Sequence, residues 1–244
     1  MTGIIVKARP AISAVAPELT ASFGRASAVP DRLVELFRDL ILSGEWKPGA
    51  PVVETAVAKS VGVSQPTVRE ALQHLEAEGL ILRRQYRSCE VIKLTRKEVD
   101  QIFRLRMEWE ALAAELAVEN RANWNPEQLS EAANNLKQAA RARDTDAFYH
   151  HDLEFHRTVW ACTGNAFLTK ALSQITVPLF AFWTLQHLRE SDVDLVKQAA
   201  AHEGIARAII SARKQRARKI TRDAMQAFWR DGARVADKTE ARIK

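Results

Sequence analysis

Cysteine is scarce in this sequence: its 244 residues include only two cysteines, Cys89 and Cys162. Two cysteines cannot form the disulfide framework that stabilises small secreted proteins. The sequence also lacks the combination of a basic start, an apolar run and a small-residue cleavage site that marks a secretory leader. Both absences favour a protein of the reducing cytoplasm.

Several enzyme motifs and long apolar runs are absent as well. Beyond residue 94 there is no glycine-rich phosphate loop, no CxxC pair and no serine placed as a nucleophile, so an enzyme would need another kind of site. The apolar segment around Ile175 to Trp183 is shorter than the roughly 20 residues that cross a bilayer. It therefore predicts a buried helix, and no membrane is expected as a partner.

The composition is that of a folded, basic protein of two domains. Hydrophobic residues make up 47% of the chain, and the formal net charge is +6 with a pI near 9.5, which fits a polyanionic partner. The basic excess lies mainly near the end: residues 200–244 hold 12 Lys and Arg against 5 Asp and Glu, whereas residues 1–95 hold 12 against 10. The densest run, Arg213 to Arg222, is typical of a solvated helix face.

A helix-turn-helix is predicted around Gly62 and Ser64. Glycine ends a helix easily because it adopts positive φ, and a serine hydroxyl suits the N-cap of the next helix. Apolar residues recur three and four positions apart on both sides of this turn, so the two short helices should share one core. These residues are Val57, Ala58 and Val61 before the turn, and Val68, Ala71, Leu72 and Leu75 after it.

The opposite face of the second helix carries residue types that read DNA. Gln65, Arg69 and Gln73 lie at i, i+4 and i+8, and Ser64 and Thr67 lie near the helix N-terminus. Arginine can bond guanine with two hydrogen bonds, glutamine can pair with adenine, and hydroxyls near a helix N-terminus can hold a phosphate. The alternative is a surface helix with ordinary polar residues.

A short basic hairpin follows this helix. Residues 80–82 are apolar, three arginines follow, and residues 91–92 are apolar again. Such a wing can place arginines along the phosphates or in the minor groove, whereas the alternative is a solvated basic loop. The candidate contacts are Arg83, Arg84 and Arg87.

The rest of the chain is predicted to be helical. Thr95 and Glu98 have capping-box spacing, which places a domain boundary near Leu94. Start and stop signals at 125–128, 164–165 and 191–194 divide the remainder into about six helices, an antiparallel bundle. We therefore expect a mainly α protein with a flexible arm over 1–28, a winged helix-turn-helix over 29–94, a helical domain over 95–237 and a tail over 238–244.

One group of side chains in the helical part could bind a metal. Asp152 and His156 lie one helical turn apart, and His202 lies on a later helix. A carboxylate and an imidazole at i, i+4 can bind one divalent ion, with a third ligand from a facing helix. The alternative from the residues alone is a buried Asp-His hydrogen bond with His202 packed nearby.

The amino-terminal motifs resemble the GntR family of winged-helix regulators. The resemblance rests on Lys47-Pro48-Gly49, Glu54 and the run GVSQPTVREALQHLEAEGLI. Gln65 stands where the family usually has arginine, and Ser88 where its wing often has glycine. The resemblance implies DNA binding, with an unusual operator sequence.

The carboxy-terminal part resembles the FCD ligand-sensing domain found in many GntR regulators, so that the resemblance covers about residues 28–230. It rests on Arg106 with Trp109-Glu110, DLEFH, Thr163-Gly164-Asn165, and His202 followed by Ile205 and Ile209. It implies a divalent metal, Zn or Ni-like, at Asp152, His156 and His202, and a pocket for small carboxylates. The family's further histidine is expected at Ala224, which leaves either a three-ligand site or a metal-free pocket.

Arg106 would bind the effector carboxylate in this pocket, and the alternative is a salt bridge to Glu110 on the same helix. These observations predict a cytoplasmic, bacterial-type, homodimeric transcription regulator that binds a palindromic double-stranded operator. We expect a repressor released by a small carboxylate. The competing hypotheses are a metal-dependent enzyme built on the bundle and a DNA-binding dimer with no effector, whose pocket is vestigial.

Overall fold

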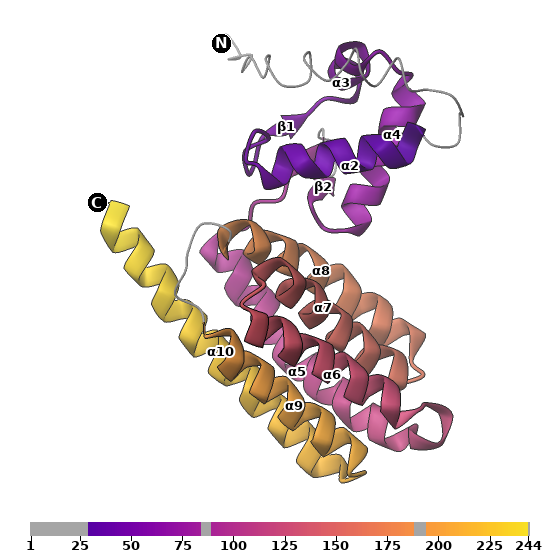
Figure 1. The fold of residues 1–244 in the computed structure, drawn as a ribbon, viewed down its shortest axis with the longest axis vertical. Helices are drawn as coiled ribbons and strands as arrows, with labels where there is room; N and C mark the ends of the chain where they lie inside the picture. The colour runs from indigo at the N-terminus through magenta and orange to yellow at the C-terminus, as the bar shows by residue number, and fades with distance from the viewer. Residues whose placement is uncertain (1–28, 84–88, 188–193, 244) are drawn as a thin grey trace. The chain divides into compact units, whose positions relative to one another are not determined.

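The computed structural model describes residues 29–83, 89–187 and 194–243 and divides into two compact units, one ending at Leu94 and the other beginning at Thr95 (Figure 1). The first unit combines short helices with a small antiparallel sheet. Its elements are α2 (Val29–Leu42), β1 (Pro51–Val52), α3 (Glu54–Val61), α4 (Gln65–Ala77), β2 (Ile81–Arg83) and β3 (Cys89–Val91).

The predicted helix-turn-helix is confirmed, with a single core. Gly62 ends α3 in the left-handed conformation at φ 72°, and the Ser64 hydroxyl caps α4 by accepting from the Thr67 amide at 3.3 Å. All seven predicted core residues are buried, and α2 adds its own apolar face with Leu33, Phe37 and Ile41. Burying such side chains stabilises a fold by about 1.5–3 kcal/mol each.

The sheet has one strand more than the predicted hairpin. β2 and β3 pair antiparallel as expected, and β1 pairs with the other edge of β3, giving the order β1-β3-β2. The two residues of β1 are too few for a periodic signal in the sequence, which is why the pattern did not reveal them. Glu90 is thereby paired with Pro51 on one side and Leu82 on the other.

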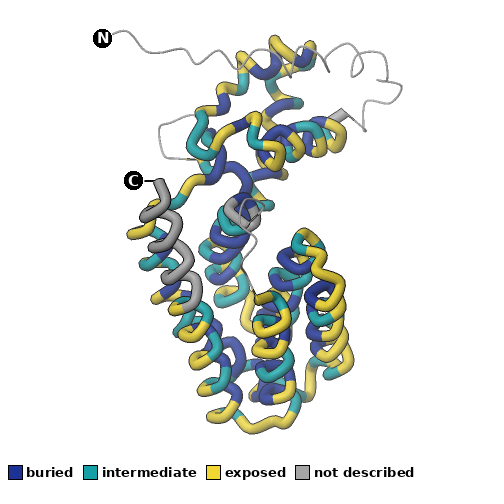
Figure 2. The backbone as a smooth tube through the Cα atoms, turned by 60° about the vertical axis from the view of Figure 1, so that its left-hand side comes forward, coloured by how far each residue is buried: buried dark blue, intermediate teal, exposed yellow. Residues whose placement is uncertain are grey.

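The second unit is the predicted bundle, with six α-helices among the described residues. They are α5 (Arg96–Glu119), α6 (Pro126–Ala142), α7 (Thr145–Cys162), α8 (Ala166–His187), α9 (Leu195–Ile210) and α10 (Lys214–Ile243), with a 3-10 turn η2 (Arg121–Asn123). Thr95 and Glu98 form the expected capping box, and Asn125 and Asp194 cap α6 and α9. Buried segments face the interior of the bundle and exposed ones line its outside (Figure 2).

The expectation that no apolar helix is long enough to cross a membrane is wrong for α8. Among the described residues, the stretch Ala166–Trp183 of α8 is long and apolar enough to cross a membrane, judged by length and composition alone, with mean hydropathy 1.2. The helix begins nine residues before the apolar segment chosen from the sequence. This is weak evidence for a membrane span, because the core helix of a soluble protein can have the same length and composition. In this structure α8 packs on α5 and α7.

The basic run at the start of α10 is largely occupied by ion pairs with acidic side chains. Lys214 contacts Glu115 and Glu119, and Arg218 also contacts Glu115. Further along α10, Arg222 pairs with Glu108 of α5. The paired residue numbers rise along α10 while they fall along α5, so the two helices are antiparallel. Much of the basic excess on α10 therefore forms ion pairs with α5.

Candidate functional sites

The outer face of α4 presents the predicted polar residues. Arg69 and Gln73 are exposed, and Gln65 and Thr67 are half-buried. Pro66 occupies the first turn, where its missing N–H costs nothing, and the Ser64 and Thr67 hydroxyls lie 2.7 Å apart beside it. A short helix with a buried apolar face and an exposed donor-rich face has the form of a DNA-recognition helix.

Glu54, the first residue of α3, accepts hydrogen bonds from two of these side chains. Its Oε2 accepts from Nε and Nη2 of Arg69 at 3.0 and 2.8 Å, and from Nε2 of Gln65 at 3.1 Å. Its other oxygen lies 3.5 Å from Nη1 of Arg83, at the end of β2. The hydrogen bond from Arg69 outweighs the effect of burial and holds the pKa of Glu54 below its usual value.

The two other predicted wing contacts, Arg84 and Arg87, lie outside the described residues. Arg83 is described: its Nε lies 3.2 Å from Glu76 of α4, so that the end of β2 is tied to both α3 and α4. The basic hairpin is therefore described only at its base.

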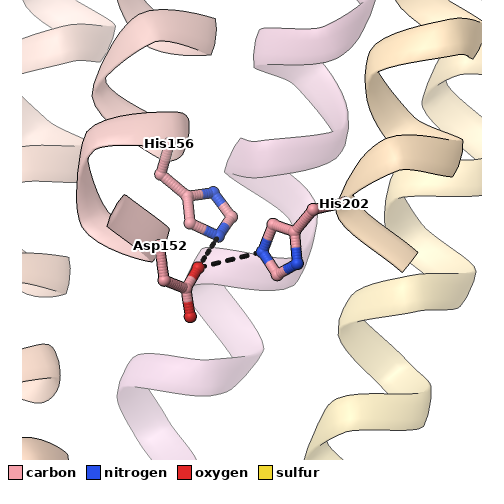
Figure 3. A group of neighbouring side chains, drawn as sticks. All are labelled: Asp152, His156 and His202. Atoms are coloured by element: carbon pink, nitrogen blue, oxygen red, sulfur yellow. Dashed lines mark ion pairs between the residues drawn. The ribbon is translucent and has the colours of Figure 1, made fainter. Parts of the chain in front are cut away.

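The structure brings the three predicted metal ligands together inside the helical bundle. Asp152 and His156 lie on α7 and His202 on α9, all are buried, and one ligand atom from each lies within 4.8 Å of the others (Figure 3). Oδ1 of Asp152 lies 2.9 Å from Nε2 of His202 and 3.5 Å from Nε2 of His156. Yet Asp152 Oδ1 and His202 Nε2 lack a hydrogen-bond partner of acceptable geometry among the described residues.

The remaining ring nitrogens of both histidines are already bonded. Nδ1 of His202 lies 2.8 Å from the carbonyl oxygen of Gln198, which only accepts, so Nδ1 carries the hydrogen of the neutral ring. Nδ1 of His156 lies 3.1 Å from Oε1 of Glu110. These contacts direct both Nε2 atoms toward Asp152, the arrangement by which outer-shell partners orient metal-binding histidines.

Glu110 of α5 is the centre of a second, buried layer. It is 1% exposed, and besides His156 it accepts from Nε of Arg106 at 3.2 Å and from Nε1 of Trp160 at 2.9 Å. Nη2 of Arg106 is buried without a hydrogen-bond partner in the part of the chain that the structure describes, and the guanidinium carbon of Arg106 lies 4.8 Å from the centre of the Phe180 ring. The salt bridge to Glu110, expected as an alternative role of Arg106, is thus present. It uses Nε and leaves Nη2 available to bind a ligand.

Burial and charge act in opposite directions on this cluster. Burial raises the pKa of Asp152, but His202 and His156 outweigh it and the net pKa is lowered. Burial lowers the pKa of both histidines; for His156 this effect prevails, whereas for His202 the Asp152 carboxylate raises the net pKa. An ionised carboxylate beside imidazole nitrogens is the donor set that a borderline divalent ion prefers.

The residues therefore fit a divalent ion with three protein ligands. The unsatisfied, buried atoms of Asp152 and His202 support this fit, since such atoms are otherwise costly. Ala224, at the position of the expected fourth ligand, lies half-buried on α10 against the apolar core and has no ligand atom.

Sequence reasoning missed the roles of two acidic residues. The sequence pattern predicts Glu110 only as a partner of Arg106, although a carboxylate on the buried face of α5 is itself a signal of a further role. Glu54 carries no local signal, because its partners lie 11 and 15 residues along the chain.

Two family models match this chain. Residues 30–91 match the model described as "Bacterial regulatory proteins, gntR family", and residues 101–227, more than half of the chain, match "FCD domain". These ranges correspond to the winged helix and the bundle.

Individual relatives agree with the family models. The "Probable D-xylose utilization operon transcriptional repressor" of Paenarthrobacter nicotinovorans is 30% identical over 169 residues, covering 69% of this chain and 73% of the relative. The "Uncharacterized HTH-type transcriptional regulator YdhC" of Bacillus subtilis (strain 168) is 39% identical over 82 residues, which span 34% of this chain and 37% of the relative.

The solved structure of E. coli McbR/YncC has the same fold, with a TM-score of 0.65 at 21% identity over 86% of this chain and 98% of that one. The matched families and relatives are transcriptional regulators, which gives no support to the enzyme alternative. The chain belongs to the GntR family of bacterial transcriptional regulators, with an FCD domain following the winged helix-turn-helix.

Proposed function

We propose that this protein is a cytoplasmic, sequence-specific repressor that binds a palindromic operator as a homodimer and is released by a small carboxylate bound in the FCD domain. The observation that supports DNA binding is the outer face of α4. Arg69 and Gln65 lie on this face, opposite the fully buried apolar face of the same helix. Contacts from Ser64, Thr67, Gln73 and Arg83, and from Arg84 and Arg87, complete the proposed interface.

The proposed effector site combines the metal ligands and Arg106. Asp152, His156 and His202 would hold a Zn- or Ni-like divalent ion, which when bound supplies a positive centre for a carboxylate. Glu110 orients His156, and the unpaired Nη2 of Arg106 would donate to an effector oxygen. The buried Nη2 of Arg106, which lacks a partner among the described residues, supports this assignment, since a bound anion would accept from it.

The dimer interface that we propose is an apolar row on α5 together with the exposed Phe167 of α8. Ile102, Leu105, Trp109, Leu112 and Leu116 follow the 3-4-3-4 spacing of a helix-to-helix seam, and none of them is fully buried within the bundle. Leu105 is 46% exposed, and on α8, which packs on α5, Phe167 is 89% exposed. A second copy would cover the α5 row and Phe167.

Leu105→Asp is therefore expected to convert the dimer to a monomer, because it places a charge within the proposed apolar seam. The molar mass by light scattering after size-exclusion chromatography checks this. Val196→Asp on α9 is the matched control, since Val196 is even more exposed, at 58%, and does not belong to the proposed interface. Equal masses for the two variants would rule out this interface.

Arg69→Ala is expected to weaken sequence-specific DNA binding strongly while the dimer stays folded. Sequences enriched from randomised duplexes provide the probe, and fluorescence anisotropy gives the affinity for the enriched and for scrambled duplexes at one salt concentration. Losing one bidentate contact should reduce the preference for the enriched sequence about tenfold or more.

The control for this test is Lys59→Ala, which removes one exposed positive charge from α3. It should change the affinities for enriched and scrambled duplexes by similar factors, because a contact to the DNA phosphates does not depend on the base sequence. An unchanged preference in Arg69→Ala would refute the role of α4 as the recognition helix.

A further inference from the structure

Glu54 holds the two side chains of α4 best placed to read bases. One carboxylate oxygen accepts both from the Nε–Nη2 edge of Arg69 and from the amide nitrogen of Gln65. The Glu54 side chain is 15% exposed and that of Arg69 is 50% exposed, so the acid lies beneath the arginine. Gln65 and Arg69 lie one helical turn apart and therefore face the same way.

The chemistry of these contacts determines which groups remain for DNA. Arginine has five N–H donors; Glu54 takes Nε–H and one hydrogen of Nη2, which leaves the end of the guanidinium formed by Nη1 and Nη2. That end can donate two parallel hydrogen bonds to O6 and N7 of guanine.

The orientation of the Gln65 amide is determined in the same way. An ionised carboxylate only accepts, so the Gln65 side chain must turn its NH2 group toward Glu54. Its Oε1 and the second Nε2 hydrogen remain as an acceptor beside a donor, the pattern complementary to N6 and N7 of adenine. Without Glu54 the amide could turn over and exchange its oxygen and nitrogen.

We propose that Glu54 is a positioning residue that sets the base preference of α4, fixing Arg69 to read guanine and Gln65 to read a nearby adenine. The proposal rests on the proposed function, because it assumes that α4 lies in the major groove. The lowered pKa of Glu54, caused first by the hydrogen bond from Arg69, supports a carboxylate that stays charged at neutral pH.

The test compares wild-type protein with Glu54→Gln, and with Glu78→Gln as a control for the lost charge. Glu78 is half-buried and pairs with Arg38 of α2 at 2.6 Å, away from the Glu54 contacts. Each protein selects sequences from a duplex library randomised over the length of an operator. Affinities are then measured for the wild-type consensus and for duplexes that differ from it at single positions.

Wild-type protein should prefer guanine and adenine at two nearby positions of each half-site by about tenfold each. In Glu54→Gln both preferences should fall several-fold, while affinity for scrambled duplexes rises, because a negative charge has left the interface. Glu78→Gln should keep both preferences. A residue that only supported the fold would instead weaken binding to all duplexes alike.

Two results would overturn the proposal, and they are distinguishable. If Glu54→Gln keeps the wild-type preferences, Glu54 does not position the reading residues even though the protein binds DNA specifically. If wild-type protein enriches no sequence from the library, the proposed DNA-binding function itself fails, and the role of Glu54 fails with it.

Discussion

Asp152→Ala is expected to remove bound metal from the protein. Oδ1 of Asp152 is the atom that both Nε2 atoms approach, at 2.9 Å from His202 and 3.5 Å from His156. Without it, two neutral imidazoles remain, which is too few for a stable site in a protein whose position 224 already lacks a ligand atom. Elemental analysis of protein purified without chelator or histidine tag should give about one divalent ion per wild-type chain and only background for the variant.

His150→Ala is the matched control for this experiment. His150 lies on the same helix, two residues from Asp152, but it is exposed and outside the ligand group. Its variant should keep the wild-type metal content. If wild-type protein contained no metal, the pocket would be metal-free, and the search for an effector would turn to ligands held by Arg106 and hydrogen bonds.

The affinity for metal should also depend on pH in a defined direction. Burial lowers the pKa of His202, but the Asp152 carboxylate outweighs it, and the net pKa lies above the usual value. A metal must displace this proton, so the apparent affinity should rise with pH until His202 is fully deprotonated. Titration of the metal-free protein at several pH values gives this dependence as part of the same experiment.

Much of the fold was predictable because its signals are local. The caps at Ser64 and Thr95 and the glycine at 62 each specify a boundary within one helical turn. The Asp152 and His156 pair is local in the same sense, since i, i+4 spacing on a helix already puts both side chains on one face. Only the approach of His202 required the bundle to be assembled.

The contacts that the sequence did not reveal join distant segments. Glu110 and Trp160 are 50 residues apart, and Glu54 and Arg69 are 15 residues apart on different helices. No periodic pattern encodes such pairs, because they depend on how helices pack. The start of α8 at Ala166 agrees with the stop-and-restart signal at 164–165, whereas its apolar stretch is longer than expected, because its first half is less apolar than the segment around Ile175 to Trp183.

Glu110→Ala is expected to destabilise the FCD domain by about 3–5 kcal/mol, the usual cost of removing one partner of a buried ion pair. Glu110 and Arg106 are each 1% exposed, so the guanidinium would be left buried without its ion-pair partner. Trp160 and His156 would lose their partner as well. The free energy of unfolding from urea denaturation, followed by circular dichroism, measures the loss.

Glu154→Ala provides the matched control on α7. Glu154 pairs with Arg157 at 2.8 Å, but both side chains are 43% exposed, and such surface pairs contribute about 0–1 kcal/mol. A loss in Glu110→Ala no larger than in Glu154→Ala would contradict a buried, structurally required carboxylate.

A double variant separates the ion pair from the other contacts of Glu110. Replacing both buried charges, as in Arg106→Met with Glu110→Leu, removes the uncompensated guanidinium, and apolar substitutes for a buried pair are often neutral or stabilising. Recovery should nevertheless be incomplete, because the Trp160 N–H and the His156 Nδ1 still lack their acceptor. The part that is not recovered measures what Glu110 contributes by accepting from Trp160 and His156 together, and that part should disappear if neither contact has an energetic role.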